Sequence, residues 1–202
     1  MIDPRPLWDF ADAAASGERF IDAAEQADEP DKTAWLSQYA RALGLMERYD
    51  EARDVLDRLS SDDAQAATYL DLERGRVRNS SGSATEARPY FEAAARTAEG
   101  AGLDALHVDA LHMVAIVAPP EEQHEINARA LSVARASSDR RAQDWDASLL
   151  NNIGMTYADA DDFEQALATF QEALTAVHEA YDQGITEQHP EVTGKIIGRS
   201  TH

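Results

Sequence analysis

The sequence contains no cysteine, and its 202 residues include only 10 glycines and 7 prolines. Without cysteine the chain can form neither a disulfide nor a thiolate metal site, and it carries no mark of an oxidising compartment. No stretch approaches the roughly 20 apolar residues of a membrane span, and the acidic residues near the start do not fit a signal peptide. We therefore expect a cytoplasmic protein that does not enter a membrane.

Positive charge is also scarce. The chain has 18 Lys and Arg against 38 Asp and Glu, which gives a formal net charge of −20, and lysine occurs only at Lys32 and Lys195. This charge repels nucleic acid phosphates and anionic lipid over most of the surface. The composition therefore argues against a nucleic acid or a membrane as the partner.

Sequence signatures of enzymes are missing as well. The chain has no glycine-rich phosphate loop, no HExxH, no GxSxG and no EF-hand loop. Its six histidines are scattered, and the closest two, His107 and His112, are five residues apart and do not share a helix face well. We predict a protein that is not an enzyme, with no catalytic residue, no metal site and no cofactor.

What the sequence does contain is apolar residues at helical spacing, interrupted by Pro, Gly and Ser clusters about 15 to 20 residues apart. Runs of alternating β-branched residues are missing. This rhythm predicts paired short helices, and a period of about 34 residues with two helices per unit indicates a repeat array. The interruptions fall at 29–31, 60–63, 79–83, 100–102, 119–120, 137–139 and 159–162.

The repeat is clearest between Asp146 and His178. Small residues, Gly154 and Ala166, let two helices approach closely, and the rings of Tyr157 and Phe170 fill the space between them. The order and spacing resemble the tetratricopeptide repeat. The positions that match are Leu150, Ile153, Gly154, Tyr157, Ala166, Phe170 and Ala173, and an earlier unit repeats part of them as Gly75, Ala87, Phe91 and Ala94.

The resemblance covers most of the chain and implies an all-α fold, a right-handed α-α superhelix of about four helix pairs. We expect a single repeat domain over 1–183, which begins with a capping helix at about 16–27 and is followed by an irregular tail at 184–202. The expected repeats span about 33–64, 68–99, 104–136 and 147–180.

The chain is also similar to a group of bacterial tetratricopeptide proteins that open with an LWDF segment and carry an HMxAIVAPPEEQ stretch. Here these read Leu7 to Phe10 and His112 to Gln123. The similarity implies no particular activity. Members of this group continue past the fourth unit, so we expect a truncated or divergent C-terminus. The apolar face of the last helix would then lack its usual cover; it consists of Leu167, Phe170, Leu174 and Val177.

The resemblance further implies where a partner binds, namely in a groove built by the first helix of each pair, chiefly at its sixth and ninth positions. Seven of these eight residues are polar or charged, and residues at i and i+3 share a helix face. The polar stripe is either a peptide-binding groove or solvated surface with local ion pairs. Its residues are Gln38, Arg41, Glu73, Arg76, Asp109, His112, Asn152 and Met155.

Two further features bear on the groove. Arg74, Arg76 and Arg78 lie close together and suit a carboxylate or phosphate, unless Arg74 is buried against a neighbouring acid instead. Asn151 and Asn152 form an amide pair, of which one can face the groove and bind an extended backbone.

These observations favour a protein- or peptide-binding scaffold whose partner presents acidic groups to Arg41 and Arg76. Two alternatives stay open from the sequence. One is a regulatory module that responds to a small ligand or peptide, and the other is a structural module that forms homo-oligomers through its last helix.

Overall fold

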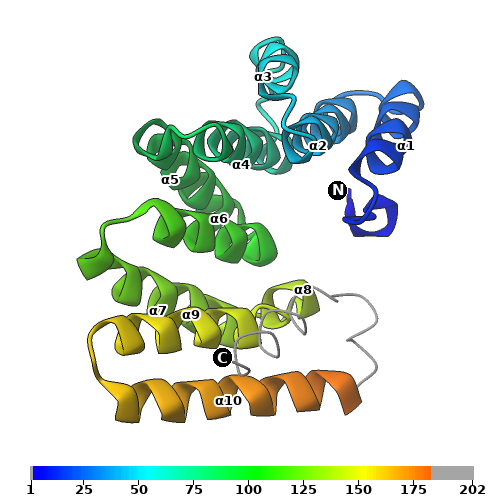
Figure 1. Ribbon diagram of the computed structural model, residues 1–202. Helices are drawn as coiled ribbons and strands as arrows, with labels where there is room; N and C mark the ends of the chain where they lie inside the picture. Colours follow the sequence, from blue (N-terminus) through cyan, green and yellow to red (C-terminus); the bar gives the residue numbers. More distant parts are fainter. Residues whose placement is uncertain (1, 183–202) are drawn as a thin grey trace. The chain divides into compact units, whose positions relative to one another are not determined.

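The computed structural model of the protein describes residues 2–182 (Figure 1). Within this range every regular element is a helix and no strand occurs. The tail predicted at 184–202 lies outside the described residues. The elements are η1 (Arg5–Leu7), α1 (Ala13–Glu25), α2 (Asp31–Leu45), α3 (Tyr49–Asp57), α4 (Ala64–Ser80), α5 (Ala84–Ala101), α6 (Asp104–Val117), α7 (Pro120–Ala136), α8 (Arg140–Gln143), α9 (Asp146–Asp159) and α10 (Phe163–Asp182).

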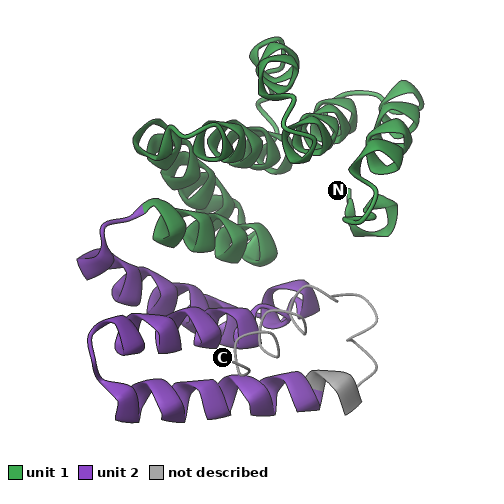
Figure 2. Cartoon of the chain, viewed as in Figure 1, with its two compact units in different colours: residues 1–117 green, residues 118–202 purple. Residues whose placement is uncertain are grey.

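The helices fall into two compact units, Met1–Val117 and Ala118–His202 (Figure 2). In the first unit α4 packs against both α2 and α6, so these three helices form one layer, while α3 and α5 pack beside it. In the second unit α9 packs against α7 and α10. The boundary falls inside the repeat expected at 104–136, and the single domain expected over 1–183 stays a prediction.

Aspartate side chains start several helices. Asp12 accepts a hydrogen bond from the backbone N–H of Ala15, and Asp63 accepts one from Ala66. Each satisfies a donor that the first turn leaves unpaired. The cap at Asp12 explains why α1 begins at Ala13, three residues before the expected start at 16. Two short elements, η1 and α8, are not predicted by the apolar periodicity because each is a turn or less.

The interior of the first unit consists of small and branched apolar side chains between α2, α3 and α4. Fully buried Leu43 and Leu56 each contribute about 1.5–3 kcal/mol by leaving water. The cluster contains Ala40, Leu43, Ala52, Leu56, Leu70 and Val77. It fixes α2 against α4, and therefore fixes the polar residues that these two helices carry on another face.

In the second unit the close helix contact predicted at Gly154 is confirmed. A Cβ atom at Gly154 would lie 2.6 Å from Cε1 of Phe170, closer than real side chains approach. Ala166, also predicted at this crossing, is buried. Glycine is therefore required at 154 for α9 and α10 to pack at this distance.

Candidate functional site

A hydrogen-bond network joins the N-terminal segment to α2, α4 and α6 in the first unit. The indole Nε1–H of Trp8 donates to Oε1 of Gln38 at 3.2 Å, and Nε2 of Gln38 donates to Oε1 of Glu73 at 3.4 Å. Arg76 then bridges Glu73 and Asp109. Five of the polar stripe's eight residues, Gln38, Arg41, Glu73, Arg76 and Asp109, therefore come together.

Arg76 is the centre of this network. Its Nη1 donates to Oε1 of Glu73 at 2.5 Å and its Nη2 donates to Oδ1 of Asp109 at 2.5 Å. The side chain is 14% exposed, so both ion pairs are largely shielded from water. Since α4 supplies Arg76 and α6 supplies Asp109, the guanidinium ties the two helices together.

Glu73 is the most deeply buried of the charged residues. Its side chain is 0% exposed, and its Oε1 receives the bonds from Gln38 and Arg76. Its other oxygen, Oε2, is also buried and has no hydrogen-bond partner within the described residues. A buried carboxylate oxygen without a donor is costly, so the contacts of the other oxygen with Gln38 and Arg76 must offset that cost.

Arg41 differs from Arg76. Its Nη1 lies 4.0 Å from Oε1 of Glu73, and within residues 2–182 the guanidinium makes no hydrogen bond. Instead it lies over the rings of Trp8 and Phe10, at 5.2 and 5.6 Å from their centres. This is cation–π geometry, which leaves the N–H donors of Arg41 available to another acceptor.

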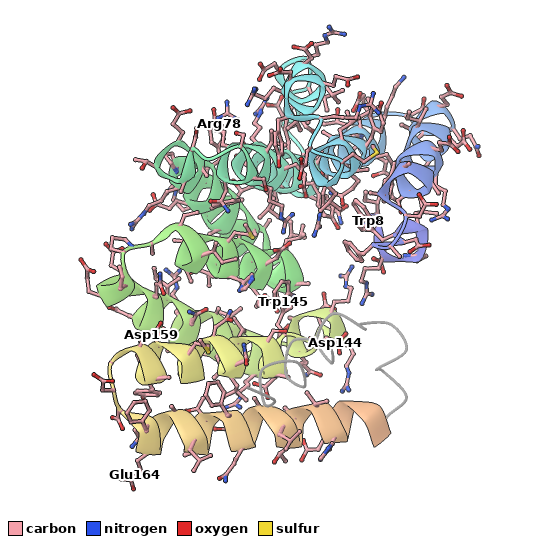
Figure 3. The ribbon with its side chains drawn as sticks, in the orientation of Figure 1. Trp8, Arg78, Asp144, Trp145, Asp159 and Glu164 are labelled. Carbon is pink, nitrogen blue, oxygen red and sulfur yellow. The ribbon has the colours of Figure 1, made fainter. Side chains whose placement is uncertain are left out.

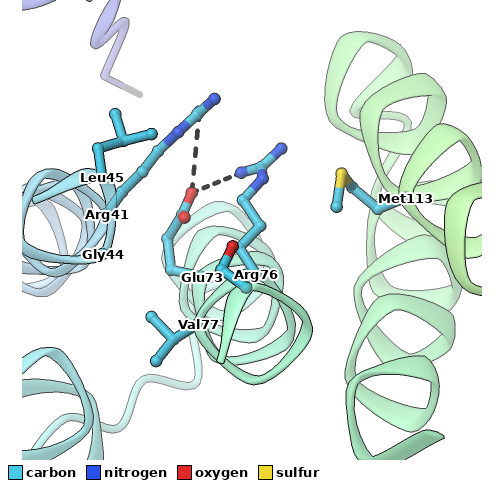
Figure 4. A pocket seen from close by; sticks show the side chains of 8 residues that line it. Arg41, Gly44, Leu45, Glu73, Arg76, Val77 and Met113 are labelled. Atoms are coloured by element: carbon cyan, nitrogen blue, oxygen red, sulfur yellow. Dashed lines mark hydrogen bonds and ion pairs between the residues drawn. The ribbon is translucent and has the colours of Figure 1, made fainter. Parts of the chain in front are cut away.

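Arg41 also lines a pocket between α2, α4 and α6 (Figure 4). Figure 4 shows the guanidinium groups of Arg41 and Arg76 converging on one oxygen of Glu73, with Met113 on the opposite wall. The lining residues are Arg41, Gly44, Leu45, Glu73, Arg76, Val77, Ser80 and Met113. The pocket is thus apolar along most of its wall and positively charged at one side.

The charges in the network shift one another's pKa. Burial favours a raised pKa for the Asp109 carboxyl, but the charges of Arg76 and Arg41, with the hydrogen bond from Arg76, bring that pKa below its ordinary value. For Arg41, burial and then the charge of Arg76 lower the pKa, while Glu73 and Asp109 oppose this. For Arg76, burial also acts to lower the pKa, but its two carboxylate partners outweigh burial and raise it.

The structure does not bring Arg74 and Arg78 to this site. Arg74 donates through Nη2 to the carbonyl oxygens of Leu56 and Leu59, both at 3.0 Å, and lies 3.6 Å from Asp71. The guanidinium of Arg78 lies 4.3 Å from the ring centre of Tyr90. Residues two apart on a helix point about 200° apart, so Arg76 faces away from both. The positive patch considered from the sequence is not formed.

The other three predicted groove residues are His112, Asn152 and Met155. His112 lies near enough to Asp109 for its charge to lower the carboxyl pKa. Asn152 and Met155 lie on α9, in the second unit, and are half-buried there. Asn151, the other half of the amide pair, is half-buried on the same helix.

Sequence reasoning missed the aromatic part of the site. Trp8 and Phe10 stack in parallel with ring centres 4.9 Å apart, and both precede the first helix of the array. A signal was present, because aromatics make up only 7% of the chain and two of them stand here within three residues. No comparable signal marks Met113.

Within the described residues no three His, Asp or Glu side chains gather as a metal ion would need. Among the helices described, none is both long and apolar enough to cross a bilayer. The residues of the site offer buried ion pairs, one arginine with free donors, and aromatic and apolar walls. Such a combination suits recognition of a partner by charge and apolar contact.

Comparison with known proteins identifies a family for one part of the chain. Residues 147–191 match the family model described as a tetratricopeptide repeat, and these residues include the Gly154–Phe170 contact. The search of curated proteins found no match. The chain is thus tetratricopeptide-like over this stretch, and such repeats generally mediate contacts between proteins.

The fold is similar to that of a solved structure, the crystal structure of BtubC (BKLC) from P. vanneervenii. The two share 17% sequence identity with a TM-score of 0.58, over 94% of this chain and 83% of that chain. At this identity the likeness concerns the fold. Together with the helices described above, it confirms the all-α superhelical solenoid predicted from the sequence.

Proposed function

We propose that the protein is a non-enzymatic scaffold that binds a protein or peptide partner on its first-helix face. We define this face as the surface of α2, α4 and α6 that carries the network of Gln38, Arg41, Glu73, Arg76 and Asp109. Residues of the same helices form the pocket beside it. The tetratricopeptide match supports the general role, and the geometry of the network supports the choice of face.

The observation that carries the proposal is the state of Arg41. Its guanidinium is 27% exposed, borders a pocket and has no hydrogen bond within the described residues, whereas Arg76 already has two carboxylate partners. An acidic side chain of a partner gains a charge-assisted hydrogen bond from Arg41 without breaking an existing one. Arg76 instead fixes the neighbouring carboxylates and keeps the site in shape.

The remaining predicted residues have supporting roles in this proposal. His112 follows Asp109 by one helical turn and adds a polar group to the same face. Asn152 and Met155 give α9 of the second unit an amide and a flexible apolar side chain at the same repeat positions, and we propose them as a peptide contact of that unit by itself. The net charge of −20 favours a protein partner with a local acidic group over a nucleic acid or a lipid surface.

A panel of fluorescein-labelled peptides tests the proposal. Each acidic peptide is paired with a peptide of the same length in which Gln replaces Glu, and binding is measured by anisotropy to the full chain. We expect Glu-containing peptides to bind, and Arg41→Ala to cost about 1.5–3 kcal/mol of that binding. Arg53→Ala is the matched control, because Arg53 lies on α3 and pairs with Asp50. Equal binding of the Glu and Gln peptides would contradict the proposal.

A second candidate function, self-association, is favoured by the surface of α10. Three of its large apolar side chains are open to solvent: Phe163 is 65%, Leu167 60% and Leu174 44% exposed. Apolar residues at this helical spacing present one stripe to solvent, and such stripes commonly mark contact surfaces. If the protein functions in this way, the stripe joins two copies of the chain. The molecular mass in solution then rises with concentration.

A further inference from the structure

The segment before α1 lies on the first unit's helices in the manner of a bound peptide. The backbone N–H of Ile2 donates to Oε1 of Gln65 at 2.8 Å, and the carbonyl of Ile2 accepts from Nε2 of Gln65 at 2.9 Å. A single side-chain amide therefore satisfies both backbone groups of one residue. The bonds are made to the backbone of Ile2 and not to its side chain, so they do not select a particular residue at this position.

The side chain of Ile2 adds an apolar anchor at the same point. It is 6% exposed and packs with Ala34 of α2 and with Ala66 and Tyr69 of α4, and Leu106 of α6 borders this cluster. Burial of this isoleucine side chain stabilises the contact about as much as burial of a core residue of the same size does. The anchor uses α2, α4 and α6, the helices that form the first-helix face.

Six residues later Trp8 supplies a second anchor (labelled in Figure 3). Its indole N–H donates to Gln38, and its ring meets Phe20 edge-on with centres 4.8 Å apart. Phe10 stacks on the outer side of the indole and is 52% exposed. The guanidinium of Arg41 lies over both rings, so the segment ends against this arginine.

We propose that this surface is a peptide-recognition site for a segment that carries an apolar residue and, six residues later, a tryptophan, with a second aromatic residue two positions after the tryptophan. Residues 2–10 of this chain are its occupant in cis. The site consists of Gln65 and the Ile2 pocket at one end and of Gln38 and Arg41 at the other. The inference rests on the proposed function and deepens it, because it names the chemistry of the partner.

Competition follows from this arrangement. A tethered segment has an effective concentration of about millimolar or more at its site, so a partner with the same pattern binds only by displacing residues 2–10. Displacement frees Gln38, Gln65 and the aromatic side of Arg41 together. Weakening the cis contact must therefore strengthen binding of the same segment added in trans.

The test uses the full chain and a synthetic, N-acetylated peptide of residues 1–12 with a fluorescein at its C-terminus. Trp8→Ala in the protein removes the cis anchor and keeps its receiving residues. We expect this variant to bind the peptide at least about tenfold more tightly than the wild-type chain does, since the competing segment is weakened. A peptide with Ala in place of Trp8 should not bind. Equal binding by the variant and the wild type would overturn the proposal.

Two additions keep the result interpretable. In the Trp8→Ala background, a further Gln38→Ala should weaken the peptide by roughly tenfold, because the indole N–H loses its acceptor. In the unmodified chain, excess peptide should move the NMR signal of the Trp8 indole N–H toward that of a free indole. A signal that stays unchanged overturns the proposal without any variant. If the acidic peptides still bind through Arg41, only this inference fails and the proposed function stands.

Discussion

The Cα of Gly75 lies directly against the ring of Phe91, sixteen residues later on α5. A Cβ at Gly75 would lie 2.6 Å from Cδ1 of that ring, and Gly154 has the same relationship to Phe170, again sixteen residues later. The same contact thus closes a helix pair in each of the two units. The two contacts differ in enclosure, because Phe91 is fully buried while Phe170 is half-buried.

Gly75→Ala should destabilise the protein by about 1–3 kcal/mol, since the added methyl group must displace an enclosed ring. Gly154→Ala should also destabilise the protein but cost less, because Phe170 is only half-buried and its ring is less enclosed. Gly100→Ala is the control: it lies in α5 with no atom within 4 Å of its added Cβ, and it should be neutral or stabilising by up to about 1 kcal/mol. The free energies of unfolding of the three variants are measured by urea denaturation. Equal changes in all three would contradict the contacts of Gly75 and Gly154 described here.

Arg76→Ala should destabilise the protein by about 3–5 kcal/mol, because it removes the guanidinium that hydrogen-bonds to the buried carboxylates of Glu73 and Asp109. Arg53→Ala removes an exposed pair and should change the free energy of unfolding by less than about 1 kcal/mol. Both are measured by urea denaturation at neutral pH. An Arg76→Ala variant as stable as the Arg53→Ala variant would show that the ion pairs are dispensable.

Acid should lower the free energy of unfolding of the protein, in part by protonating Asp109. Its folded-state pKa lies below the ordinary 3.8, so the carboxylate contributes stability above that value and loses it as the pH falls through the lowered pKa. The Asp109→Asn variant has no carboxylate at this position, so it cannot lose this pH-dependent contribution. We therefore expect the difference in unfolding free energy between wild type and Asp109→Asn to narrow as the pH falls from about 5 through the ordinary pKa of 3.8 and below it. Unfolding free energies across that range test this, and a constant difference would exclude the linkage.

For the self-association candidate, Leu174→Asp should abolish any rise of apparent mass with concentration, because it places a charge in the apolar stripe of α10. Thr175→Asp adds the same charge one position away, outside the stripe, and should leave association unchanged. Sedimentation equilibrium of the wild type and both variants gives the masses. A wild-type chain that stays monomeric at all concentrations removes this candidate.

The fold was accessible from the sequence because its signals are local. Gly154, Ala166 and Phe170 stand at spacings that only a close helix pair explains, and the match at residues 147–191 falls on the same stretch. The polar stripe was found by the same register. Its five members in α2, α4 and α6 lie together, and their role as a binding groove stays a prediction.

The burial and the bonding partners of those residues could not be predicted from the sequence. Gln38 and Glu73 look like surface residues in the sequence, yet both are fully buried. Gln38 bonds to Trp8, 30 residues before it, and to Glu73, 35 residues after it. Periodicity within a helix carries no information about such distant partners, and it also could not show that Arg76 is occupied while Arg41 is not.

The contact of Arg74 with the end of α3 has a consequence for the order in which parts of the chain open. Helix α3 has nine residues, too few to persist alone in water, and the carbonyls of Leu56 and Leu59 at its end are held by a guanidinium from α4. When α4 opens, α3 loses that support and opens with it. Amide hydrogens of α3 should therefore never exchange more slowly than those of α4, so the two helices form one cooperative unit in native-state exchange.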